Sequence, residues 1–85
     1  MKAGKFVIAA VSAGWVFAGT VGEVTEYHVT LLDACVIRRW GTTRGLGELA
    51  ISGPQAGTVL DPAGTVWISR QHLLFGLACA KRWPL

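Results

Sequence analysis

Apolar residues occur in short runs that glycine-rich and polar turns separate. Residues 5–11 are mostly β-branched, aromatic or small and predict a first strand, and residues 15–24 predict a second. The short Ser12-Ala13-Gly14 segment between them predicts a tight connection. Gly19 and Gly22 interrupt the second run, and glycine inside a strand indicates a bulge or a sharp coil, as at the corner of a small barrel.

The pattern continues as strands up to residue 40. Thr25-Glu26 is polar and predicts a hairpin turn, after which residues 27–32 predict a third strand. Asp33-Ala34 marks a bend, and residues 35–40 predict a further strand, the fourth.

One segment has the period of a helix rather than of a strand. The turn over residues 41–45 is rich in glycine and threonine, and a helix is expected from residue 46 to residue 52. Gly53 ends this helix and Pro54 prevents its continuation. A helix of about two turns is unstable alone and must dock on the sheet. The apolar face that would dock consists of Leu46, Leu49 and Ala50.

The C-terminal third returns to strand patterns. The sequence Asp61-Pro62-Ala63-Gly64 has proline and glycine where a β-turn favours them, and residues 65–68 predict a strand after it. Residues 72–80 are largely apolar and fit a helix or a strand; a strand is favoured because a small barrel needs a closing strand there. Residues 81–83 form a basic, aromatic tail.

Together these elements predict a mainly β fold, either a small SH3-like barrel or a strongly coiled antiparallel sheet, with one short helix around residues 46–52. The 85 residues are expected to form a single β-rich domain, 1–85. A chain of this size buries about 60% of its surface on folding. Because 52% of the residues are hydrophobic and only 15% are charged, we expect apolar surface to remain for a homo-oligomer interface.

The apolar stretches are too short for a membrane span of roughly 18 residues, so no membrane association is expected. Residues 6–17 resemble the apolar region of a signal peptide, with Lys2 and Lys5 as its basic flank. The β-branched residues in that stretch and its continuation into a second strand favour a strand instead, and with it an intracellular protein.

The residues that usually carry catalysis show no recognisable arrangement. Cys35 and Cys79 have apolar neighbours and no metal-ligand spacing, which favours two small buried hydrophobes over a metal site or a disulfide. His28, His72 and Glu48 are the best acid–base candidates, but no catalytic motif contains them. We therefore expect a protein that is not an enzyme and uses no metal or cofactor.

Binding chemistry concentrates just before the helix. Backbone N–H groups at a helix N-terminus bind phosphate, and Thr42 and Thr43 add hydroxyl donors while Arg44 adds a positive charge. The turn lacks the lysine of a P-loop. The alternative is that its glycines only form the turn.

Aromatic and arginine side chains adjoin the same turn. Arg38 and Arg39 suit phosphate, and Trp40 or the more distant Trp15 suits a stacked base. The alternative is that the tryptophans are core or interface residues and that the arginines are only solvated. The net charge of +3 favours anionic ligands but is small for a nucleic-acid-binding protein, so nucleic acid is an unlikely partner on sequence grounds.

The segment from Asp33 to Gly53 resembles the signature of a small phage and prophage family catalogued as a domain of unknown function. That pattern has Ser-Ala-Gly near the start, then an Ala-x-x-Ile stretch, a Trp, a Gly/Thr/Asn turn and Leu-x-Glu-Leu-Ala-x-x-Gly. The matching residues are Ser12, Ala13, Gly14, Ala34, Ile37, Trp40, Leu46, Glu48, Leu49, Ala50 and Gly53. Many members have basic residues directly after the Ala and a Trp after the Ile, where this chain has Cys35, Val36 and Arg38.

The resemblance implies a phage protein acting in the cytoplasm of an infected bacterial host. By analogy with small oligomeric phage proteins, it suggests an anti-defence sponge that sequesters a nucleotide immune signal, such as a cyclic ADP-ribose derivative, at a subunit interface. Two alternatives remain: a β-barrel interaction module that binds a host protein or nucleic acid, and an enzyme that degrades a nucleotide signal.

Overall fold

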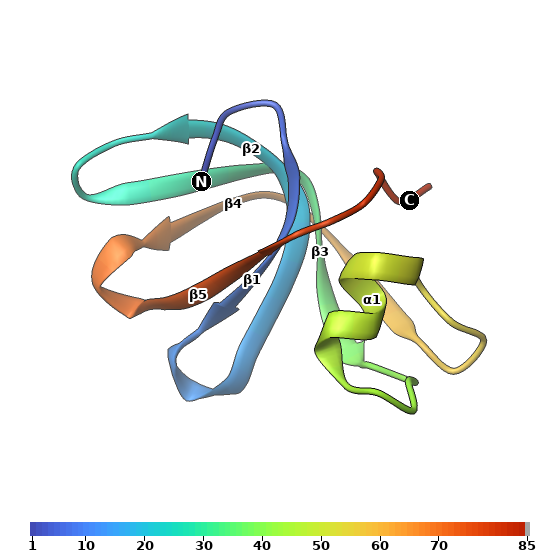
Figure 1. The fold of residues 1–85 in the computed structure, drawn as a ribbon. Helices are drawn as coiled ribbons and strands as arrows, with labels where there is room; N and C mark the ends of the chain where they lie inside the picture. Colours follow the sequence, from blue (N-terminus) through green and yellow to red (C-terminus); the bar gives the residue numbers. More distant parts are fainter. Residues whose placement is uncertain (85) are drawn as a thin grey trace.

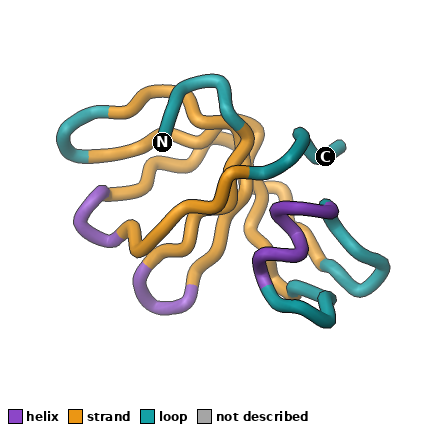
Figure 2. Tube along the Cα trace, in the orientation of Figure 1, coloured by secondary structure: helices purple, strands orange, loops and turns teal. Residues whose placement is uncertain are grey.

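The computed structural model describes residues 1–84 and shows a mainly β protein with one short α-helix (Figures 1 and 2). The five strands form one antiparallel sheet in the order β4-β3-β2-β1-β5. Short 3-10 turns close two of the hairpins, η1 between β1 and β2 and η2 between β4 and β5. The elements are β1 (Phe6–Val11), η1 (Ser12–Gly14), β2 (Trp15–Val24), β3 (His28–Arg39), α1 (Leu46–Ser52), β4 (Val59–Ser69), η2 (Arg70–His72) and β5 (Leu73–Ala78).

The sheet bends sharply where β2 crosses β3, as the glycines in β2 predict. A side chain on Gly19 would place its Cβ 3.1 Å from the Cα of Ala34, a tight contact, so glycine favours this close approach of the two strands. The pairing register shifts here and again next to Gly22. On β3, Asp33 takes up the bend with a left-handed φ of 47°. The expected mainly β fold, with one bent antiparallel sheet and one short helix, is confirmed.

Two boundary predictions were wrong, both because a bulge was interpreted as a break. The bend at Asp33-Ala34 does not separate two strands; it lies inside the single strand β3. The proline- and glycine-containing segment at residues 61–64 is not a β-turn, because it lies inside β4, where Pro62 faces Cys35. A proline is tolerated there because β4 is an edge strand.

The helix and the last strand agree with the sequence pattern. The helix α1 spans the predicted residues, and Gly53 ends it with a φ of 84° while its N–H donates to the carbonyl oxygen of Leu49 at 2.9 Å. All three residues of the expected docking face are buried. The apolar segment after residue 72 forms strand β5, which pairs with β1.

The buried residues form two clusters. The first includes three residues of α1 and Trp83 of the C-terminal tail, and the second consists of residues from β1, β2, β3 and β4. Strand β1 supplies both clusters, with Phe6 and Ile8 in the first and Val7 and Ala9 in the second. The first cluster comprises Phe6, Ile8, Val16, Ala18, Cys35, Ile37, Leu46, Leu49, Ala50 and Trp83, and the second comprises Val7, Ala9, Val21, Val29, Leu31, Ala34 and Ile68.

Both cysteines are free thiols within these apolar surroundings, as the sequence suggests. Cys35 belongs to the first cluster, and Cys79 packs against it half-buried. Burial raises the pKa of both thiols, that of Cys79 to about 11. Among the described residues, no helix is both long and apolar enough to cross a membrane.

Candidate ligand-binding groove

The turn before α1 uses its hydrogen-bonding groups within the chain. Glu48 accepts a hydrogen bond from the backbone N–H of Arg44 at 3.0 Å and another from the hydroxyl of Thr43 at 3.3 Å. The hydroxyl of Thr42 donates to the carbonyl oxygen of Gly45 at 2.8 Å. A carboxylate from α1 thus lies where the sequence predicts a phosphate, and Glu48 contacts Arg44 through its backbone N–H.

Arg38 and the backbone of Trp40, beside this turn, also have hydrogen-bond partners within the chain. Arg38 forms an exposed ion pair with Asp61 of β4, with Nε 2.8 Å from Oδ2, and this contact raises the pKa of the guanidinium. Arg39 is exposed at the end of β3. The carbonyl oxygen of Trp40 accepts a hydrogen bond from Thr58 at 2.7 Å, and its partly exposed indole lies beside Gly45.

Trp15 lies apart from that turn, in a groove on the second-cluster side of the sheet that we call the aromatic groove. Its indole stacks on Phe17, with ring centroids 6.3 Å apart and planes 14° from parallel. Trp67 of β4 also lines the groove. The aromatic groove has a volume of about 550 Å³, and none of residues 38–44 lines it. Its lining residues are Val11, Ser12, Ala13, Trp15, Phe17, Val66, Trp67, Ile68, Ser69 and His72.

The polar groups of the aromatic groove come from η1 and η2. The hydroxyl of Ser12 donates to the carbonyl oxygen of His72 at 3.2 Å, which joins the two turns. The close approach requires a sharp chain reversal, with φ of 67° at Ala13 and 83° at Gly14. Ser69 and the His72 ring complete the polar part. The groove is therefore an apolar, aromatic surface with a few hydrogen-bonding groups along its edge, which is the usual composition of a small-molecule site.

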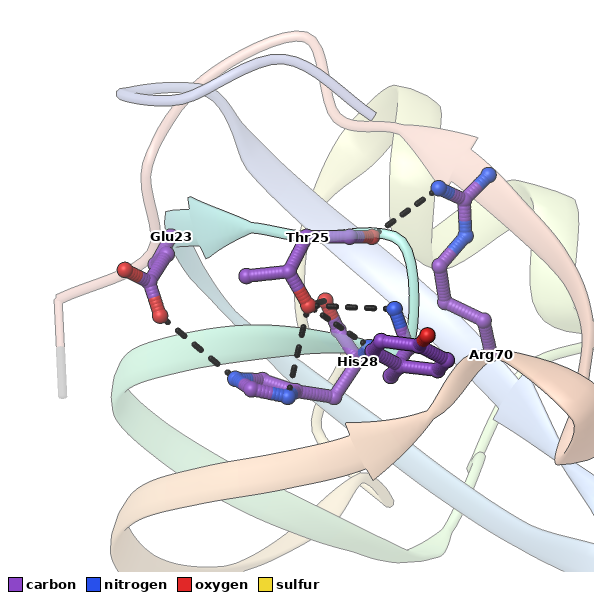
Figure 3. Close-up of polar contacts among 5 residues, drawn as sticks. Glu23, Thr25, His28 and Arg70 are labelled. Carbon is purple, nitrogen blue, oxygen red and sulfur yellow. Dashed lines mark hydrogen bonds and ion pairs between the residues drawn. The ribbon is translucent and has the colours of Figure 1, made fainter.

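A polar network ties η2 to the β2–β3 turn (Figure 3). Arg70 donates through Nη1 to the carbonyl oxygen of Thr25 at 3.0 Å. His28 lies between a carboxylate and a hydroxyl, with Nε2 3.5 Å from Oε1 of Glu23 and Nδ1 3.4 Å from Oγ1 of Thr25. This order of carboxylate, imidazole and hydroxyl resembles the arrangement of a catalytic triad.

The hydrogen bonds around Thr25 argue for a structural role instead. Its hydroxyl oxygen accepts hydrogen bonds from the backbone N–H groups of Tyr27 at 3.1 Å and His28 at 3.0 Å. A hydroxyl has two acceptor lone pairs, and a nucleophile needs one directed at its substrate. Both are engaged here, so the network fixes the turn. The ring of Tyr27 is left 74% exposed beside it.

Among the described residues, no three histidine, cysteine, aspartate or glutamate side chains are grouped closely enough to hold a metal ion. The structure thus offers binding surfaces built from aromatic and hydrogen-bonding groups.

Comparisons with known proteins give the fold but not the family. No family model matches the chain. Over 48 residues, 56% of the chain, it is 38% identical to a CinA-like protein of Cytophaga hutchinsonii and 40% identical to one of Gemmatimonas aurantiaca. The chain spans only 12% and 11% of the lengths of these relatives.

A solved structure matches nearly the whole chain. A heptameric archaeal Sm protein, described for its implications for the eukaryotic snRNP core, superimposes with a TM-score of 0.60 at 18% identity, covering 88% of this chain and 85% of that one. The fold is Sm-like.

Within this Sm-like fold, the residues predicted for one site lie in two places. Trp15 lies in the aromatic groove, whereas Trp40 to Arg44 lie in the turn before α1. Sequence reasoning did not place Trp67 in the site and named His72 only as an acid–base candidate, because the contact between η1 and η2 that brings these residues near Trp15 is long-range. The signal that identifies Trp67 is the alternation Val66-Trp67-Ile68, in which the tryptophan is the exposed residue between two partly or fully buried ones.

Proposed function

We propose that this protein binds a nucleotide whose base stacks in the aromatic groove. The observation that carries the proposal is the nearly parallel stack of Trp15 on Phe17 in a groove that Trp67 also lines. Stacking on an aromatic side chain contributes about 1–3 kcal/mol per base. The volume of about 550 Å³ is within the usual range for small-ligand sites.

The turn η2 supplies the groups suited to phosphate. Arg70 and His72 both lie in this turn, and His72 lines the aromatic groove. One Nη of Arg70 is used by Thr25, and the side chain is exposed, so other guanidinium N–H groups face solvent. A planar guanidinium binds phosphate through paired hydrogen bonds. One nucleotide could then place its base in the aromatic groove and its phosphate on η2.

Self-association is the second part of the proposal. Strands β4 and β5 are the two edges of the sheet, and edge strands present unpaired backbone groups to other chains. Trp67, Leu74 and Phe75 on these edges are 77%, 66% and 50% exposed. The Sm protein of similar fold is heptameric. A homo-oligomer formed through these edges would cover apolar surface that a monomer leaves in water.

The resemblance to the phage and prophage family gives this binding a biological purpose. A small oligomeric protein that binds a nucleotide and leaves it intact would lower the free concentration of that nucleotide in an infected cell. We therefore propose sequestration of a nucleotide immune signal of the cyclic ADP-ribose or related type, in the host cytoplasm.

Calorimetric titration with cyclic ADP-ribose, ADP-ribose and a cyclic dinucleotide tests the binding. Trp15→Ala and Trp67→Ala should each lower the affinity for the tightest-binding ligand by about tenfold, because each removes a stacking surface. Trp40→Ala is the matched control, since it removes an indole from the turn before α1. Loss of affinity in the control alone would show that the nucleotide binds at the turn before α1. The absence of binding by any of these nucleotides would refute the proposal.

Two further measurements separate this function from its alternatives. Native mass spectrometry reports the oligomer and any nucleotide that co-purifies. Binding of a single-stranded oligonucleotide that weakens steeply between 50 and 200 mM salt would favour a nucleic-acid-binding module. A ligand recovered intact after denaturation of the complex supports sequestration, whereas a cleaved ligand supports an enzyme.

A further inference from the structure

A second cavity lies on the other side of the bent sheet, and it shares no lining residue with the aromatic groove. It forms where the kink in β3 and β4 meets the C-terminal tail, because Asp33 and Gly64 belong to the kink and Arg82 and Trp83 to the tail. Its volume is about 700 Å³. The cavity is therefore a structural consequence of the bulges that bend the sheet.

Two opposite charges line this cavity without neutralising each other. Asp33 and Arg82 both contribute to its wall. Within residues 1–84, neither forms an ion pair or a side-chain hydrogen bond. Asp33 has a left-handed backbone conformation, with φ of 47°, and is exposed. A carboxylate and a guanidinium on one cavity wall suit a ligand that carries both charges.

A third polar group lies in the same wall. Trp83 is only 3% exposed, and its indole Nε1 is buried without a hydrogen-bond partner among the described residues. A buried donor without an acceptor destabilises the folded chain.

Apart from Thr20 and Cys35, the rest of the wall is apolar. Phe6 packs against Trp83, with ring centroids 5.3 Å apart and planes at 52°. Leu60 and Pro62 of β4 face the same space. This surface suits a large aliphatic or aromatic side chain.

We propose that this cavity binds a free α-amino acid with a large apolar side chain. The ligand's carboxylate pairs with the guanidinium of Arg82, its ammonium group pairs with the carboxylate of Asp33, and its side chain lies against Phe6, Leu60 and Pro62. A ligand with one charge satisfies only one of the two partners. The zwitterion satisfies both, and it makes charge-assisted hydrogen bonds at each end. This binding is independent of the nucleotide proposed for the aromatic groove.

Titration of the ¹⁵N-labelled protein with L-phenylalanine tests the proposal by NMR. The indole N–H signal of Trp83, identified by its absence in Trp83→Phe, should move on titration, while the Trp15 and Trp67 signals should stay. Phenethylamine lacks the carboxylate and 3-phenylpropionate lacks the ammonium group. Each should bind about tenfold more weakly than phenylalanine, as expected for the loss of one charge-assisted contact.

Two variants assign the charges. Asp33→Asn should lower the affinity for phenylalanine about tenfold and leave the affinity for 3-phenylpropionate unchanged. Asparagine is chosen because it tolerates the left-handed backbone. Arg82→Gln should weaken phenylalanine and leave phenethylamine unchanged. Asp61→Asn and Arg39→Gln make the same changes of charge outside the cavity and serve as controls. Equal binding of all three probes, equal loss in the control variants, or no movement of the Trp83 signal at millimolar phenylalanine would overturn the proposal.

Discussion

The carboxylate of Glu48 accepts a hydrogen bond from the backbone N–H of Arg44, with Oε1 3.0 Å from the nitrogen. This contact ties the preceding turn to α1, whose N-cap residue Gly45 has no side-chain cap. Glu48→Ala should lower the free energy of unfolding by about 1 kcal/mol, the usual net contribution of a hydrogen bond. Urea denaturation measures this change. Glu26→Ala removes an exposed acid that makes no side-chain contact in the described structure and should change stability little.

The same variant tests the turn that the sequence favours as an anion site. If the backbone N–H groups there can bind phosphate, removal of the Glu48 carboxylate should expose them. Sulfate or ADP would then raise the melting temperature of Glu48→Ala more than that of the wild type. Equal shifts in the two proteins would mean that the turn binds no anion even when its N–H groups are free.

Gly41 and Gly47 should respond in opposite directions to substitution by alanine. A Cβ on Gly41 would lie 2.1 Å from the carbonyl carbon of Gly57, and its φ of 65° disfavours any side chain. Gly47 lies in α1 with no atom within 4 Å of its Cβ position. Gly41→Ala should therefore destabilise the fold by more than about 2 kcal/mol, and Gly47→Ala should stabilise it by about 0.5–1 kcal/mol. Thermal unfolding decides both, and a stabilised Gly41→Ala would disprove the close approach of residues 41 and 57.

The helix is held to the sheet mainly through Leu49, which is fully buried. Leu49→Ala should cost about 2–5 kcal/mol, because it removes a buried side chain and leaves a cavity. That loss is a large part of the roughly 5–15 kcal/mol by which a small domain is stable. Ile51→Ala, on the outer side of the same helix where the side chain is 75% exposed, should change stability by less than about 0.5 kcal/mol. Comparable losses in the two variants would show that α1 does not dock as described.

Cys79 should react slowly with alkylating reagents at pH 8. Burial raises its pKa from 9.0 to about 11, so the reactive thiolate is about 100-fold scarcer than in the unfolded chain. Mass spectrometry of iodoacetamide-treated protein, with and without urea, measures the difference. A rate in the native protein equal to that in urea would refute the burial of Cys79.

The raised pKa of Cys79 also predicts how stability depends on pH. Above about pH 9 the unfolded thiol loses its proton while the folded thiol keeps its proton until about pH 11, so the unfolded state binds fewer protons. The contribution of this thiol is therefore complete below pH 9 and declines as the pH rises towards 11. Cys79→Ala should show a shallower loss of stability over that range, and an unchanged slope would contradict the prediction.

Local signals predicted the elements well, and long-range contacts explain the errors. The helix over residues 46–52 and the bulges at Gly19 and Gly22 follow from period and from glycine chemistry, which any short window contains. The continuity of β3 through Asp33 depends on pairing with both neighbouring strands, which no local pattern reveals. Pro62 was assigned to a turn for the same reason, because a proline fits inside β4 only when β4 is an edge strand.

The candidate site shows the same division. The residue types suited to nucleotides are visible in the sequence, but their grouping is not. Arg38 and the backbone N–H of Arg44 were candidate phosphate donors, but in the structure they pair with Asp61 and Glu48. Trp15 is exposed, and the groove around it depends on η1 and η2 lying together.

Strand β1 has consequences for how the chain finds its alignment. All its residues from Phe6 to Ala10 are buried, so both of its faces are apolar. A slip of one residue would exchange the two faces without placing any charge in the interior, and polarity alone therefore provides little penalty against it. The register is fixed instead by the turn from Ser12 to Gly14, whose two left-handed residues place Val11 opposite Trp15. Three residues at the surface thus carry the alignment information that the buried strand lacks.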